Sequence, residues 1–234
     1  MNWQELIKYS TVPLRKLDDD NMPCGIGSGC LFDFKDYRFL LTVFHVAEKS
    51  AKWCAQLQFN DEIQKTEVLY LNKFSFIGDF TQDKKRITDV EFSFHPVPND
   101  FKCFFHHRTW DGKTLELKER PVFTVNDVGE PDKQTYYGFS GEIKPTSIPD
   151  LSAFETEIHI YHGLKYDRFE NDRHYFKMPE IHPGHEWFRG CSGAPIIGEN
   201  GKVVSLVCGG CTEKNEIYGN NLPKCIRTLD YFIE

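Results

Sequence analysis

The chain contains 234 residues, of which 35 are acidic and 28 are basic, giving a formal net charge of −7. With this acidic balance and no long basic run, nucleic acid is not expected as a partner. The length suits one compact all-β unit or two small lobes with ample chain for a core, and no apolar run approaches the roughly eighteen residues that indicate a membrane span.

The first ten residues predict a short helix and no export signal. They lack a cationic start, an apolar core of signal-peptide length and a small-residue cleavage site, so we expect a cytoplasmic protein. Asn2 can cap a helix that runs to Tyr9, with Trp3 and Ile7 on one face. We assign residues 1–22 to an N-terminal helical extension.

Short apolar runs separated by turns fill the rest of the chain. Their high Phe and β-branched content, with little helical periodicity, favours antiparallel strands. In the first half the runs are residues 30–34, 38–46, 53–59, 66–76, 89–95 and 101–106. After a turn-rich linker at 107–120, a second series comprises residues 122–125, 134–139, 154–161, 173–178, 194–198, 203–208 and 216–219. Residues 222–232 have the apolar spacing of a closing helix.

The cysteines are interpreted as free thiols, because no export signal accompanies them. There are eight, Cys24, Cys30, Cys54, Cys103, Cys191, Cys208, Cys211 and Cys225. The pairs Cys208 with Cys211 and His182 with His185 each have the spacing of half a zinc site, but no second pair has matching spacing. We therefore expect neither a metal nor a cofactor.

Residues 189–197 (RGCSGAPII) predict a tight turn that leads into a buried strand. Gly190 and Gly193 allow a sharp bend and leave room for a substrate carbonyl. Ser192 would then be a nucleophile, and its own N–H and that of Gly190 would be the oxyanion donors. The alternative is an ordinary turn at the start of a strand.

A nucleophilic serine needs a base and a carboxylate that orients the base. The apolar segment at 39–47 places His45 at its end, and Asp89 precedes the alternating strand pattern that follows it. Asp79 and Asp83 are weaker candidates because the charged stretch at 79–86 is typical of a solvated loop. The alternative for His45 is a histidine bonded within the core.

These segments resemble the chymotrypsin/trypsin-like serine peptidases, including their bacterial members, in the same order along the chain. The matching segments are residues 27–32 (GSGCLF), 41–46 (LTVFHV), 88–92 (TDVEF), 136–141 (YYGFSG), 190–195 (GCSGAP) and 201–207 (GKVVSLV). The resemblance implies an all-β fold of two six-stranded antiparallel barrels with the active site between them and a C-terminal helix. The first lobe would span residues 23–110, with His45 and Asp89, and the second 111–234, with Ser192.

The resemblance also implies a function. His45, Asp89 and Ser192 would hydrolyse peptide bonds in protein or peptide substrates through an acyl-enzyme. The other reading is a regulatory or binding module that keeps the fold without turnover.

Three departures from the family pattern bear on activation and specificity. Val46 stands where secreted animal members have a cysteine, so that disulfide is absent. Cys191 replaces the aspartate that pairs with a newly made amino terminus, so the site forms either as synthesised or when a partner or substrate orders it. Cys191 is also an alternative nucleophile, although relatives that use cysteine place it at the position of Ser192.

The primary pocket is predicted from the same resemblance. Glu186 lies at the position of the pocket floor, and Gly209 and Gly210 at its wall. A carboxylate there would favour Lys or Arg in the substrate, unless Arg189 neutralises it.

Overall fold

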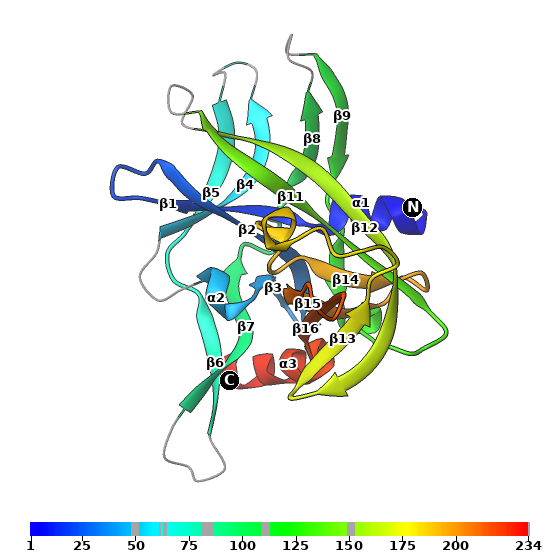
Figure 1. The fold of residues 1–234 in the computed structure, drawn as a ribbon. Coiled ribbons are helices and arrows are strands. Elements are labelled where there is room, and N and C mark those ends of the chain that lie inside the picture. Colours follow the sequence, from blue (N-terminus) through cyan, green and yellow to red (C-terminus); the bar gives the residue numbers. More distant parts are fainter. Residues whose placement is uncertain are drawn as a thin grey trace.

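The structure is a computed structural model that describes residues 1–47, 52–60, 62, 65–80, 87–108, 113–148 and 153–233. Strands dominate it, and most of them form a curved sheet, here called the first barrel, and a closed second barrel that packs against it (Figure 1). Within the described residues, no helix is long and apolar enough to cross a membrane.

The first barrel is built from one antiparallel sheet with the strand order β5-β4-β1-β2-β3-β7-β6. Its strands are β1 (Val12–Leu17), β2 (Pro23–Phe34), β3 (Tyr37–Thr42), β4 (Lys52–Asn60), β5 (Lys65–Leu71), β6 (Ser75–Phe80) and β7 (Ile87–Val97). Only residues 72–74 separate β5 from β6. One stretch of chain therefore supplies both ends of the sheet and brings them together.

The second barrel is closed, with the strand order β11-β12-β13-β16-β15-β14. Its strands are β11 (Tyr136–Ile148), β12 (Ala153–Glu170), β13 (Arg173–Lys177), β14 (Pro195–Gly198), β15 (Val203–Cys211) and β16 (Glu216–Asn220). The predicted all-β fold class is confirmed, with six antiparallel strands in this barrel and seven, not six, along the path of the first sheet. Short apolar runs explain it, because some strands, such as β14, are buried on both faces and others, such as β13, alternate between buried and more exposed residues.

The chain between the barrels is more structured than a simple linker. The strands β8 (Phe104–Arg108) and β9 (Thr114–Glu119) form a separate hairpin that extends away from the body in Figure 1. After it, β10 (Val122–Thr124) pairs in parallel with β2, and a short 3₁₀ helix, η1 (Val125–Asp127), leads to the second barrel.

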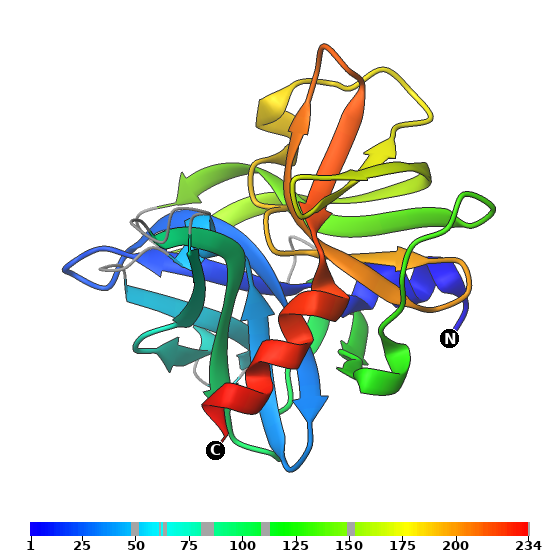
Figure 2. The ribbon, with the colours of Figure 1, turned by 90° about the horizontal axis from the view of Figure 1, so that it is seen from below.

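The two ends of the chain bind to the outside of the barrels. Helix α1 (Trp3–Ser10) begins at Asn2, whose side chain accepts from the Glu5 N–H, and it contacts β11 and β14. Residues 12–17, which we predicted to be part of the N-terminal helical extension, instead form β1 of the first sheet. Helix α3 (Leu222–Arg227) and η4 (Thr228–Phe232) close the chain and lie across the first barrel (Figure 2).

Each barrel has its own core. Phe32, Phe39 and Leu41 are among the buried residues of the first, which also includes Leu222 and Ile226 of α3. Phe139 and Ile196 belong to the core of the second. Because α3 follows directly from β16, its burial against the first barrel ties the two lobes together.

Candidate active site

His45 lies where the first barrel presents a short helix to solvent. Strand β3 ends at Thr42, and the four-residue helix α2 (Phe44–Ala47) carries His45 with its side chain 40% exposed. Its Nδ1 atom lies 2.9 Å from Oε2 of Glu91, and its backbone N–H donates to the same oxygen at 3.4 Å. A carboxylate on Nδ1 holds the ring in one orientation and leaves Nε2 as the basic nitrogen.

Strand register explains how Glu91 reaches the histidine. Thr42, the last residue of β3, pairs with Ser93 of β7, so Glu91 lies just beyond the end of β3, where α2 begins. The backbone carbonyl of Glu91 also accepts from the buried Asn220 side chain of β16 at 2.7 Å. This hydrogen bond joins the carboxylate-bearing strand of one barrel to the other barrel.

Burial and hydrogen bonding act in opposite directions on Glu91. Burial favours raising the pKa of the Glu91 carboxyl, but the hydrogen bonds and charge of His45 outweigh it and hold the pKa below its ordinary value of 4.5. Glu91 is therefore ionised at neutral pH and able to stabilise a positively charged imidazole.

Asp89, the carboxylate that the sequence singled out, lies in the same strand. Its backbone pairs with Gly78 of β6, but its side chain lies outside the described residues. Glu91 is two residues further on in β7, and the pairing of β7 with β6 shifts register between Asp89 and Ser93. The sequence prediction did not include Glu91, although its place in the same segment, 88–92, was the signal that could have found it.

Ser192 lies in a tight turn between η3 (His185–Phe188) and β14. Gly190 and Gly193 have φ angles of 104° and 90°, which are unfavourable for residues with a Cβ. A Cβ on Gly193 would overlap the Ser28 carbonyl oxygen and Thr42 Oγ1. Both glycines are therefore required by the shape of the turn, as the sequence predicted.

Strand β2 connects the serine turn to the histidine helix. The Ser28 N–H donates to the Ser192 carbonyl at 2.9 Å, and Ser28 Oγ donates to the Gly190 carbonyl at 2.7 Å. The neighbouring Gly27 packs so tightly on Val46 that an added Cβ would lie 2.6 Å from Val46 Cγ1. Adjacent residues of one strand thus hold the turn that carries Ser192 and the helix that carries His45.

The N–H groups of the turn divide into two kinds. The Cys191 N–H donates to the Phe188 carbonyl at 2.9 Å. Within the part of the chain that the structure describes, the N–H groups of Gly190 and Ser192 donate no hydrogen bond, which leaves both available to an oxyanion. Over the same residues, no hydrogen bond joins Ser192 to His45.

The Cys191 thiol is buried, and its environment makes it unreactive. Its side chain packs on β11, where a Cβ on Gly141 would lie 2.5 Å from Cys191 Sγ, and none of the residue is exposed. Burial, with a smaller contribution from the charge of Glu142, raises the pKa of the Cys191 thiol far above its ordinary value. A thiol in this environment is a poor nucleophile.

The residues predicted to form the primary pocket lie around η3 and β15. The Glu186 side chain is 79% exposed, and its Oε2 lies 3.8 Å from Arg189 Nη1. Gly210 faces His182, since an added Cβ would lie 2.6 Å from His182 Nε2, while Gly209 packs against Tyr218. An exposed carboxylate with a neighbouring arginine is a weak attraction for a substrate cation, so a basic preference stays a prediction.

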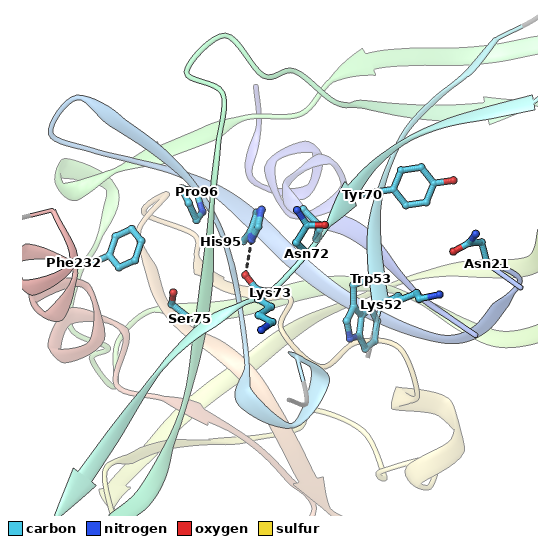
Figure 3. Close-up of a pocket in the computed structure, with 11 residues that line it drawn as sticks. Asn21, Lys52, Trp53, Tyr70, Asn72, Lys73, Ser75, His95, Pro96 and Phe232 are labelled. Atoms are coloured by element: carbon cyan, nitrogen blue, oxygen red, sulfur yellow. Dashed lines mark hydrogen bonds between the residues drawn. The ribbon is translucent and has the colours of Figure 1, made fainter. Parts of the chain in front are cut away.

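A pocket of about 740 Å³ lies away from His45 and Ser192, on the first barrel beside the segment that connects β5 to β6. Figure 3 shows its lining side chains, with the His95 ring bonded to the Lys73 carbonyl at 2.8 Å. The lining residues are Asn21, Lys52, Trp53, Tyr70, Leu71, Asn72, Lys73, Ser75, His95, Pro96 and Phe232. None of them is His45, Glu91 or Ser192.

No family profile matches the sequence, and no curated protein is similar to it. Solved structures do resemble the fold, among them two proteases. A serine endoprotease from Yersinia pestis is 10% identical with a TM-score of 0.58, and the match covers 98% of this chain but 64% of the endoprotease. Catalytically active tobacco etch virus protease complexed with product is 11% identical with a TM-score of 0.53, and the match covers 98% of this chain and 80% of that one.

The chain has a chymotrypsin-like protease fold. At these identities the likeness concerns the fold alone, so the chemistry has to be argued from the chain's own residues. The chain also spans less than two-thirds of the Yersinia pestis endoprotease.

Proposed function

We propose that the chain is a serine endopeptidase in which Ser192 is the nucleophile, His45 the general base and Glu91 the carboxylate that orients His45. The observation that carries this proposal is the 2.9 Å contact between His45 Nδ1 and Glu91 Oε2. Strand β2 contacts both the helix that carries His45 and the turn that carries Ser192. Glu91 thus takes the role that the sequence assigned to Asp89.

The mechanism follows from these positions. The Nδ1–H of His45 donates a hydrogen bond to Glu91 and stays on the ring. His45 Nε2 accepts the hydroxyl proton of Ser192 as the Ser192 oxygen attacks a peptide carbonyl. The free N–H groups of Gly190 and Ser192 bind the negative charge that develops on that carbonyl oxygen. His45 then protonates the leaving amine, and water repeats the cycle on the acyl-enzyme.

One observation favours a second candidate, a latent or binding form of the same fold. Within the described residues Ser192 and His45 are not hydrogen-bonded to each other. Catalysis therefore requires Ser192 Oγ to come within hydrogen-bonding distance of Nε2, either without a partner or when a substrate or partner protein binds. A chain in which this approach never occurs would bind peptides without cleaving them.

Labelling with a fluorophosphonate probe tests the proposal, because the electrophilic phosphorus reacts rapidly with a nucleophile that a neighbouring base activates. Wild-type protein should label, Ser192→Ala should not, and Cys191→Ala should label like the wild type. Loss of labelling in Cys191→Ala with retention in Ser192→Ala would overturn the assignment of the nucleophile. Absence of labelling in all three, with and without added peptide, would favour the binding form.

A further inference from the structure

Gly190, which would donate one of the two oxyanion hydrogen bonds, is held between the two barrels. A Cβ on Gly190 would overlap Ile26 Cδ1 of β2 on one side and the carbonyl oxygen of Glu142 in β11 on the other. Its φ of 104° is available to glycine and costly for other residues. The orientation of its N–H therefore depends on how β2 and β11 are spaced.

An ion pair fixes this spacing. Arg15 of β1 donates from Nη2 to Glu142 Oε2 at 2.5 Å, and the two side chains are only 8% and 15% exposed. Arg15 pairs with Ile26 in the first sheet, so the same strand pair that carries the cation also carries the Ile26 contact. The ion pair thus joins β11 to β1, and β1 is paired at Arg15 with Ile26, the β2 residue that contacts Gly190.

Further hydrogen bonds fix the two charged groups. The same Arg15 Nη2 donates to Gln56 Oε1 at 2.9 Å, and Thr156 Oγ1 donates to Glu142 Oε2 at 2.9 Å. The adjacent Gly141 supports the buried Cys191 side chain. Gly141 and Glu142 of β11 therefore contact Cys191 and Gly190 of the turn. Residue 191 itself is an uncharged cysteine and cannot form an ion pair that would order the turn.

We propose that Arg15 and Glu142 are positioning residues for the oxyanion site, and that their ion pair holds the Gly190 N–H in the orientation that acylation requires. The inference rests on the proposed function, because it assigns these residues a role in forming the Ser192 site. It also accounts for a turn that is ordered without an amino-terminal ion pair.

The rate of fluorophosphonate labelling gives the first test. Glu142→Gln keeps the side-chain shape but removes the charge, and we expect labelling at saturating probe to slow by about tenfold or more with little change in the probe concentration for half-maximal rate. Arg15→Lys keeps the positive charge that pairs with Glu142, so this variant should keep most of the wild-type labelling rate. A wild-type rate in Glu142→Gln would overturn the proposal.

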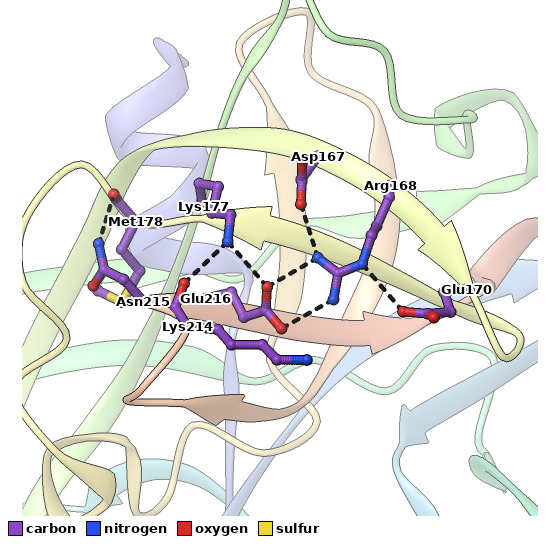
Figure 4. A network of polar contacts seen from close by, with 8 residues as sticks. All are labelled: Asp167, Arg168, Glu170, Lys177, Met178, Lys214, Asn215 and Glu216. Atoms are coloured by element: carbon purple, nitrogen blue, oxygen red, sulfur yellow. Dashed lines mark hydrogen bonds and ion pairs between the residues drawn. The ribbon is translucent and has the colours of Figure 1, made fainter.

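Glu216→Gln is the matched control. Glu216 is buried in the same barrel and accepts from Arg168 at 2.9 and 3.1 Å and from Lys177 at 3.3 Å (Figure 4). Among the described residues, its side chain forms no hydrogen bond or ion pair with residues 189–193. We expect it to lower the melting temperature as Glu142→Gln does, while labelling stays at the wild-type rate. Equal slowing in both variants would show a general loss of stability and overturn the positioning role.

Hydrogen–deuterium exchange separates this inference from the proposed function. Exchange of the peptide that covers residues 188–193 should become several-fold faster in Glu142→Gln and stay unchanged in Glu216→Gln, whether or not the wild type labels. Unchanged exchange in Glu142→Gln would overturn the inference. Faster exchange in a protein that never labels would support the positioning role and count against the peptidase.

Discussion

His45 and Glu91 contact each other twice, through the ring Nδ1 at 2.9 Å and through the backbone N–H at 3.4 Å, both to the same carboxylate oxygen. A single side chain thus fixes both the imidazole and the first turn of the helix that carries it. An exposed ion pair alone contributes little to stability, so stability does not explain why one carboxylate contacts both the ring and the backbone of His45. The arrangement has a clear use if His45 Nε2 receives a proton.

Cysteine reactivity should follow burial. Cys24 is exposed and Cys211 half-exposed, whereas the other six are buried, and burial raises the pKa of Cys30 and of Cys225 to about 12. Native iodoacetamide labelling followed by mass spectrometry should modify Cys24 first and Cys191 at least about 100-fold more slowly. Modification of Cys191 at the rate of Cys24 would show that the turn opens readily.

A buried histidine should make stability fall in mild acid. Burial lowers the pKa of His174 to about 4, against a smaller opposing effect of the neighbouring Asn221 side chain. The nearest carboxylate oxygen is Glu130 Oε2, 3.8 Å from Nε2. Since the unfolded chain binds this proton near the ordinary pKa of 6.5, the contribution is complete above pH 6.5 and is lost as the pH falls toward 4.

The size of this effect is up to about 3 kcal/mol at the acid end. Urea denaturation at pH 7 and at pH 4.5 measures it, and His174→Phe, which keeps a ring between Tyr166 and Phe169, should remove most of the difference. If the His174→Phe variant loses as much stability between pH 7 and pH 4.5 as the wild type does, other groups cause the acid sensitivity.

The Gly193 position should tolerate no side chain. In Gly193→Ala the new Cβ would meet the Ser28 carbonyl and Thr42 Oγ1, so the turn must move off β2. We expect labelling to fall by about 100-fold or more. Gly201→Ala is the control, because Gly201 has a φ of 79° with no atom near its added Cβ, so it should cost about 1 kcal/mol of stability and no activity.

Much of the fold could be predicted from local patterns. The apolar runs at 38–46 and 203–208 predicted strands, and the strand residues 39–42 and 203–208 are buried on both faces. The Asn2 cap is visible in the sequence because its partner Glu5 is three residues away. Strand β1 escaped prediction because it contains Pro13 and the buried Arg15, whose charge is satisfied only by a residue 127 positions away.

The candidate site was predictable in part for a similar reason. Glycines mark the Ser192 turn because their φ angles are a local requirement. Local periodicity does not distinguish Asp89 from Glu91, because the pairing of β6 with β7 shifts register between Asp89 and Ser93 and such a shift is not visible in the sequence. The pairing of Thr42 with Ser93 decides which of them adjoins His45, and that register is a tertiary property.

The most direct test of the central claim is the fluorophosphonate labelling rate of Glu91→Gln beside Asp89→Asn, with Ser192→Ala as the baseline. Replacing the orienting carboxylate of such a triad by its amide favours the wrong imidazole tautomer and slows the reaction by about 10⁴-fold. We predict that loss for Glu91→Gln and a rate within about threefold of wild type for Asp89→Asn. The reverse pattern would contradict the assignment and identify Asp89 as the carboxylate that serves His45.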